Sequence, residues 1–149
     1  MAMVLNKASI GPEAGDGVYA PQPARTFKIA NSVAAFGPTT ALKLAGQASN
    51  GLPVVTPITA ASDVPYCIAA TSLRGNSFAG GDKIKAWVSD EVVWMKASAA
   101  ITQGAKVSVA TNGTIATADE TPVLGFAESS AAAAGDLVAV RITAPYSVA

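Results

Sequence analysis

The chain contains no histidine and one cysteine in 149 residues. Without histidine it cannot use Ser-His or Cys-His catalysis or build a histidine-based metal site. Cys67 has no partner for an intrachain disulfide, and its place between Tyr66 and Ile68 in an apolar run is typical of a small core residue. We therefore expect no catalytic residue, no cofactor and no metal, and we expect that the protein is not an enzyme.

Charged side chains are also scarce. They make up 13% of the chain, which is about half the usual share. Ten basic and ten acidic residues balance, so nothing favours long-range attraction to nucleic acid or to an anionic membrane, and we expect neither as a partner. Because a lone soluble monomer normally carries more surface charge, we expect other protein to cover much of this surface.

Carboxylates are the remaining candidates for acid–base chemistry, and they occur as two adjacent pairs. Asp90 precedes Glu91, and Asp119 precedes Glu120. Adjacent side chains diverge where a strand begins, whereas paired catalytic carboxylates must face each other across a cleft. Both pairs are therefore interpreted as turn or loop residues in solvent.

Residues 1–35 differ from the rest of the chain. The run GPEAGDGVYAPQPAR (11–25) is dense in glycine and proline, which disfavours regular helix or strand. It is either a disordered tail or an arm that orders on a partner. Val18, Tyr19 and Phe27 are apolar anchors that a solvent tail would not need. We therefore predict an extended N-terminal arm over 1–35, with these three side chains at an interface.

Short β signals continue from residue 36 to residue 149. The segments expected to be strands are 40–46, 52–59, 66–71, 82–89, 91–97, 105–111, 114–118, 122–128 and 137–144. Asn112-Gly113 predicts a hairpin, and VSDEVV (88–93) predicts a second one that turns at Ser89 and Asp90. Short, regularly spaced strands without long helical periodicity predict an all-β fold, a small barrel or a sandwich, over 36–149.

The two tryptophans fall within these expected strands. Trp87 lies between Ala86 and Val88, and Trp94 lies in the next strand segment. Strand placement beside apolar residues favours packing in a core or an interface. We therefore include Trp87 and Trp94 among the candidate interface residues.

Two stretches share one layout. PYCIAATSLRGNSFAGGDKIKAWV (65–88) and PVLGFAESSAAAAGDLVAVRI (122–142) each run from proline through an apolar strand and a small-residue loop to Gly-Asp and an alternating strand. We interpret this as a degenerate internal repeat. Chance is the alternative, because Gly-Asp before a strand is common turn chemistry.

The C-terminal half carries a resemblance. ITQGAKVSVATNGTIATA (101–118) contains G-x-x-V before a small hairpin, and the next stretch contains P-V-x-G-x-A and an alanine-rich G-D-x-V-x-V ending. This pattern, over roughly 65–145, resembles the capsid cement or decoration proteins of tailed bacteriophages. These motifs are structural, and the arm is not covered.

The resemblance implies a function and partners. It implies a structural virion protein, assembled in the host cytoplasm, that sits on the outer capsid surface, often as a homotrimer, and bridges neighbouring major capsid proteins. The partners would be the major capsid protein and copies of the chain itself. The alternative is a carbohydrate- or surface-binding β module of a phage fibre or of a head-fibre base, in which Tyr66, Trp87 and Trp94 would stack on sugar rings.

Overall fold

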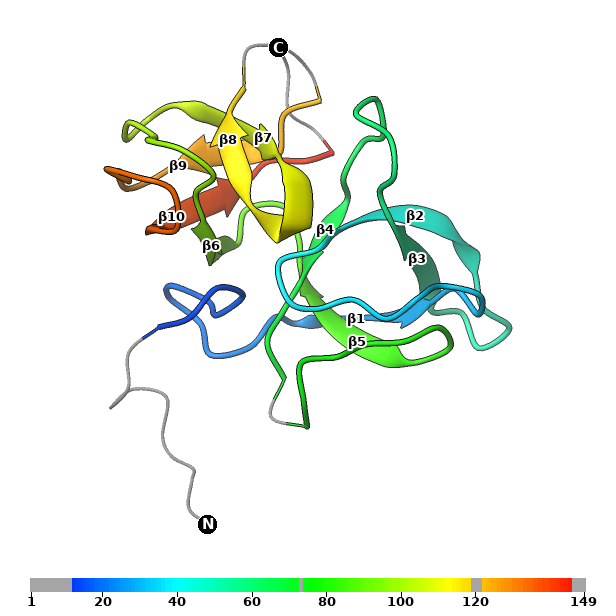
Figure 1. Cartoon of the computed structure of the whole chain (residues 1–149). Coiled ribbons are helices and arrows are strands. Elements are labelled where there is room, and N and C mark those ends of the chain that lie inside the picture. Colours follow the sequence, from blue (N-terminus) through cyan, green and yellow to red (C-terminus); the bar gives the residue numbers. More distant parts are fainter. Residues whose placement is uncertain (1–11, 73, 119–121, 146–149) are drawn as a thin grey trace.

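The computed structural model describes residues 12–72, 74–118 and 122–145, and its regular elements there are ten strands and one 3-10 turn (Thr111–Gly113). The strands are β1 (Arg25–Ile29), β2 (Ala41–Gln47), β3 (Pro53–Pro57), β4 (Cys67–Ala69), β5 (Lys83–Trp87), β6 (Val92–Lys96), β7 (Lys106–Val109), β8 (Ile115–Thr117), β9 (Gly125–Ala127) and β10 (Leu137–Ile142). Figure 1 shows them as two groups, β1–β5 and β6–β10. The predicted all-β fold is confirmed.

The first five strands form a closed barrel in the order β1-β3-β2-β4-β5. β1 pairs with β3 in parallel and with β5 in antiparallel orientation, which closes the ring. Alternate side chains point inward, as the period of two in a strand requires. The interior is built from the buried residues Phe27, Ile29, Leu42, Val55, Cys67, Ala69, Ile84 and Ala86.

The last five strands form a second sheet in the order β6-β10-β9-β7-β8. Its two outer strands meet where Ala97, directly after β6, forms a parallel bridge with Ile115 of β8. The Ser98 N–H donates to the Ile115 carbonyl oxygen at 2.8 Å beside that bridge. The second sheet therefore curls until its edges touch.

The two groups of strands repeat one design. Phe27 of β1 lies opposite Ile84 of β5, and Met95 of β6 lies opposite Val138 of β10 in the same register. The other pairings correspond too, since β2 pairs with β3 and β4 as β7 pairs with β8 and β9. The layout shared by 65–88 and 122–142 is thus the second half, β4–β5 and β9–β10, of a larger repeat of five strands.

The Gly-Asp turns before β5 and β10 are built alike. Gly81 and Gly135 have φ values of 89° and 91°, which glycine adopts without steric cost. The Asp82 carboxylate accepts a hydrogen bond from the Ala79 N–H at 2.9 Å, and the Asp136 carboxylate accepts one from the backbone N–H three residues before it at 3.1 Å. Each aspartate thus satisfies a backbone donor that the tight turn leaves unpaired. This local stability accounts for the reuse of the motif.

The start of the barrel corrects the predicted boundary of the arm. β1 lies within the segment 1–35, and Phe27 is 0% exposed inside the barrel. The barrel therefore begins at Arg25 rather than at residue 36. The short alternation Phe27, Lys28, Ile29, with the two apolar side chains inward, follows the last proline of the arm too closely for composition to separate the two.

One predicted hairpin is confirmed and the other is wrong. β7 and β8 pair around Asn112 and Gly113, whose φ values are both positive. VSDEVV (88–93) does form a tight turn, with the Glu91 N–H donating to the Val88 carbonyl at 3.1 Å. However, β5 belongs to the barrel and β6 to the second sheet, so this turn connects the two bodies instead of joining paired strands.

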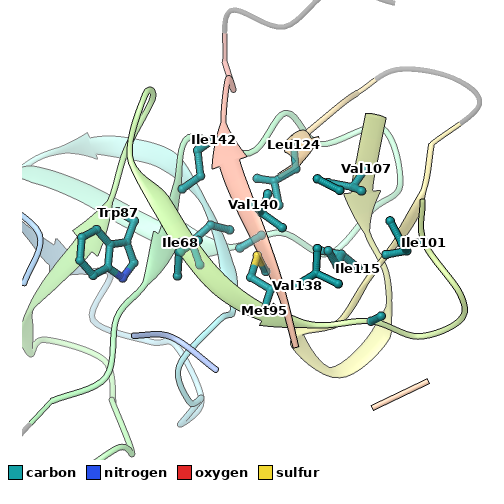
Figure 2. Packing of buried hydrophobic residues seen from close by; sticks show 14 of the residues in the cluster. Ile68, Trp87, Met95, Ile101, Val107, Ile115, Leu124, Val138, Val140 and Ile142 are labelled. Carbon is teal, nitrogen blue, oxygen red and sulfur yellow. The ribbon is translucent and has the colours of Figure 1, made fainter. Parts of the chain in front are cut away.

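A continuous core joins the two bodies. Ala41, Ile68 and Trp87 point out of the barrel and belong to one buried cluster with second-sheet residues such as Leu124 and Ile142. Figure 2 shows Ile68 between Trp87 and the side chains of the second sheet. The outward face of β2, β4 and β5 is therefore apolar because it packs against the other half of the chain.

The reactivity of Cys67 tests whether its side chain is buried in the barrel core. Its side chain is 0% exposed, and burial raises the pKa of its thiol from 9.0 to about 12. We expect no reaction of the native protein with a thiol reagent at neutral pH, and one equivalent of reaction after unfolding, because the thiolate is the nucleophile.

The same pKa shift predicts a pH dependence. Above about pH 9 the unfolded thiol ionises while the folded one stays protonated, so stability should fall as the pH rises toward 12. In the experiment with the thiol reagent, rapid stoichiometric labelling of the native protein would contradict the burial of Cys67.

Candidate functional site

The segment that precedes β1 lies along the free edge of β6. The Gly15 N–H donates to the Trp94 carbonyl at 2.8 Å, and the Trp94 N–H donates to the Asp16 carbonyl at 2.8 Å. The Val18 N–H donates to the Val92 carbonyl at 3.0 Å. Residues 15–18 thus act as a short added strand that covers an otherwise open sheet edge. In Figure 1 this blue segment passes beside β6.

Trp87 fixes this segment to the barrel. Its side chain is 1% exposed, and its Nε1–H donates to the Gly15 carbonyl at 2.9 Å. The Thr71 hydroxyl donates to the Asp16 carboxylate at 2.6 Å. A side chain at position 17 would collide with the Trp87 ring and the Ala20 carbonyl, so Gly17 permits the close approach. The described part of the arm is therefore docked on its own chain.

The five predicted interface residues do not form one surface. Phe27 and Trp87 are buried in the cores of the chain itself, so neither presents its side chain at the surface of the chain. Val18 and Trp94 are half-buried where the arm meets β6. Tyr19 is 76% exposed. Of the five, Tyr19 is therefore the side chain best placed to reach another molecule.

The three aromatic residues considered for sugar stacking are also separated. Trp87 is buried, and Tyr66 is half-buried in an edge-to-face contact with Phe27, at 6.0 Å between the ring centroids. Trp94 is half-buried. A sugar platform needs open ring faces, and Trp87 offers none.

Other apolar side chains are exposed at positions that no sequence pattern singles out. Among the described residues the large exposed ones besides Tyr19 are Leu44, Val64 and Phe126, at 51%, 52% and 39%. Phe126 lies on β9 opposite Arg141 of β10, whose guanidinium is paired with the Glu128 carboxylate at 2.6 Å. Leu44 and Phe126 lie in short strands and Val64 lies in the loop before β4, and an isolated apolar residue in such a segment carries no sequence signal of exposure.

Of the two carboxylate pairs considered for acid–base chemistry, the pair Asp90-Glu91 lies among the described residues and forms part of a turn. The Glu91 carboxylate accepts the Val88 N–H at 2.8 Å, and Asp90 occupies the positive-φ position of the same turn at φ 74°. Asp119 and Glu120 lie outside the residues that the structure describes. Glu91 thus stabilises the connection between barrel and second sheet, as expected for a turn residue.

The described residues bring no three of His, Cys, Asp and Glu together in a group that could hold a metal ion. An open groove between barrel and second sheet is lined by residues such as Thr40, Ile58, Val109 and Gly113, and no titratable side chain lines it. No helix in 12–72, 74–118 or 122–145 has the length and apolar character to cross a membrane.

Fold and surface together define a class, an all-β protein made of two five-stranded bodies with the same topology. No family model and no curated protein matches the sequence. The solved structure of the head fiber gp8.5 N base in bacteriophage phi29 matches the fold with a TM-score of 0.55 and 18% sequence identity. The match covers 79% of this chain and 91% of that chain. At this identity the likeness shows a shared fold.

Proposed function

We propose that the chain is a structural protein of a bacteriophage particle that binds the outer surface of the head. The observation that carries the proposal is the fold shared with a phage head-fibre base over most of both chains. The resemblance of 65–145 to capsid cement and decoration proteins rests on sequence motifs and supports the same kind of function. The protein then acts through binding alone, without a cofactor and without catalysis.

In the cement form of this proposal, the chain bridges neighbouring copies of the major capsid protein, and its partners include copies of itself in a homotrimer. A protein that binds the assembled shell more tightly than its separated subunits stabilises the shell by mass action. Low charge supports a role against other protein surfaces rather than nucleic acid or membrane.

A second function uses the same surface differently. The protein with the matching fold is itself described as the base of a head fibre. On that model the two bodies anchor an external fibre to the head instead of joining capsid subunits. Both functions require attachment to the outer capsid, but only the first requires stabilisation of the shell.

The experiment uses heads purified from phage in which the coding sequence is deleted. The purified full chain is added, heads are sedimented, and the bound copies are counted against the major capsid protein. A cement protein saturates many sites and raises the temperature at which heads disrupt, whereas a fibre base binds without that rise. Absence of co-sedimentation at saturating protein would refute both functions.

Tyr19 gives a sharper prediction for the attachment surface. Tyr19→Ala is expected to weaken head binding about tenfold, because exposed tyrosines are frequent binding hot spots, while leaving the melting temperature unchanged. Gln22→Ala is the matched control, since Gln22 is exposed in the same segment. Equal affinity of Tyr19→Ala and the unmodified chain in the co-sedimentation assay would remove Tyr19 from the interface.

A further inference from the structure

The two bodies of one chain pack against each other through two different surfaces. One side is the outer face of the barrel, defined by Ala41, Ile68, Ala70 and Trp87. The other is an end of the second sheet, defined by Val93, Leu124 and Ile142. All seven residues are buried in one cluster, and Figure 2 shows Ile68 next to the second-sheet side chains. An outer face of one body thus covers an end of the next.

The repeat supplies a counterpart to the outer face. In the barrel Ile68 pairs with Ala41 and with Trp87. In the second sheet Phe126 pairs in the same way with Lys106 and with Arg141. Phe126 is therefore the counterpart of Ile68, Lys106 that of Ala41, and Arg141 that of Trp87. The counterparts of the outer face, on the second sheet, are Lys106, Phe126, Glu128 and Arg141. Phe126 thus stands where the barrel has the fully buried Ile68.

The repeat also supplies a counterpart to the covered end. Arg25 pairs with Ala86 in the barrel, and Val93 pairs with Val140 in the second sheet, so Arg25 corresponds to Val93. The Tyr66 N–H donates to the Leu42 carbonyl and the Leu124 N–H donates to the Val107 carbonyl, so Tyr66 corresponds to Leu124. The counterparts of the covered end, on the barrel, are Arg25, Tyr66 and Val88.

Both counterpart surfaces remain open within one chain. Val93, Leu124 and Ile142 are fully buried, whereas Arg25 is exposed and Tyr66 is half-buried. Leu44 corresponds to Val109 by register, since they face Val55 and Ile115, and Val109 packs on the joint core while Leu44 is exposed.

The exposed apolar residues therefore coincide with the surfaces that the repeat leaves uncovered. Leu44 and Val64 lie by the end of the barrel, Val64 being two residues before Tyr66, and Phe126 lies on the outer face of the second sheet. Around Phe126 the Arg141–Glu128 ion pair provides a charged rim. An aromatic centre with a polar rim is typical of protein–protein contact surfaces.

We propose that a second copy of this chain occupies these surfaces in head-to-tail order. The outer face of the second sheet, with Phe126 at its centre, packs on the barrel end that carries Leu44 and Val64 in the next copy. This continues between chains the packing already present within one chain. Such a heterologous contact forms a ring if its rotation closes. The inference does not depend on head binding.

Two single substitutions test this directly by analytical ultracentrifugation. The unmodified chain should be associated at a protein concentration of roughly 100 µM. Phe126→Glu disrupts one side of the contact and Leu44→Glu disrupts the other. At the same concentration, association of each variant alone should therefore be weakened at least tenfold, so that the monomer predominates. Tyr19→Glu, at an exposed position that belongs to neither surface, is the control and should associate like the unmodified chain.

Mixing the two variants distinguishes head-to-tail contact from a symmetric one. Phe126→Glu retains an intact barrel end and Leu44→Glu an intact outer face, so an equimolar mixture should form dimers and nothing larger. If either glutamate lowers the melting temperature, Phe126→Ser and Leu44→Ser replace them. A monomeric unmodified chain, variants that associate as strongly as the unmodified chain, or a mixture that stays monomeric would each overturn the proposal.

Discussion

Trp87→Ala is expected to lower the free energy of unfolding by about 3–5 kcal/mol, which is the usual cost of deleting a large buried aromatic side chain. The ring is 1% exposed within the core that joins barrel and second sheet. Its Nε1–H also holds the Gly15 carbonyl at 2.9 Å. The substitution therefore opens a cavity between the two bodies and releases the segment that covers the β6 edge.

Guanidinium unfolding and limited proteolysis measure these two consequences. Trp87→Phe keeps most of the packing and loses the hydrogen bond, so it should cost less than the alanine variant and still increase cleavage within 12–24. Trp94→Ala deletes the same side chain from a half-buried site and serves as the matched control, with a smaller loss of stability. If Trp87→Ala and Trp94→Ala cost the same, Trp87 does not anchor the joint core.

Gly125→Ala is expected to destabilise the protein by about 3 kcal/mol or more, at the upper end of the range for overpacked cores. A Cβ at this position would overlap the Arg141 carbonyl oxygen and approach the Ile142 Cα at 3.1 Å. Both contacts are with the backbone of the neighbouring strand, which cannot move without separating β9 from β10. The expected result is a large drop in melting temperature or loss of soluble protein.

One substitution and one native residue serve as comparisons for Gly125→Ala. Gly37→Ala adds the same methyl group where the nearest heavy atom, the Asn76 carbonyl oxygen, lies at 3.4 Å, so its effect should be small. Cys67 is the counterpart of Gly125 in the barrel by register, which shows that the topology itself accepts a side chain at this position. A Gly125→Ala protein as stable as the Gly37→Ala protein would contradict the close approach of β9 and β10.

Most strands could be predicted from local pattern. The nine segments predicted from residue 40 onward each overlap one of β2–β10, and only β2 extends beyond its segment, by one residue. β1 was missed, because Phe27, Lys28 and Ile29 offer only a brief alternation directly after a proline-rich run. The pairing of β5 and β6 was wrong, since a tight turn at Ser89 and Asp90 is compatible with either a hairpin or a crossing between two sheets.

The candidate site was less predictable than the fold. Phe27 and Trp87 were named for their apolar character, which core and interface residues share, and the structure buries both in the chain itself. Phe126 went unnamed because a phenylalanine in a short apolar strand gives no sign of which way it points. Its exposure follows from the register of β9 against β7 and β10.

The sequence by itself determined the all-β character, the positions of nearly all strands, the Gly-Asp turns and the lack of histidine-based chemistry. These depend on alternation, on turn residues and on composition, which act over a few neighbouring residues. Only the tertiary structure decided that the strands form two bodies of equal topology, that residues 15–18 fold back on β6, and which apolar residues stay uncovered. Those outcomes depend on contacts between segments far apart in the chain, which local patterns do not encode.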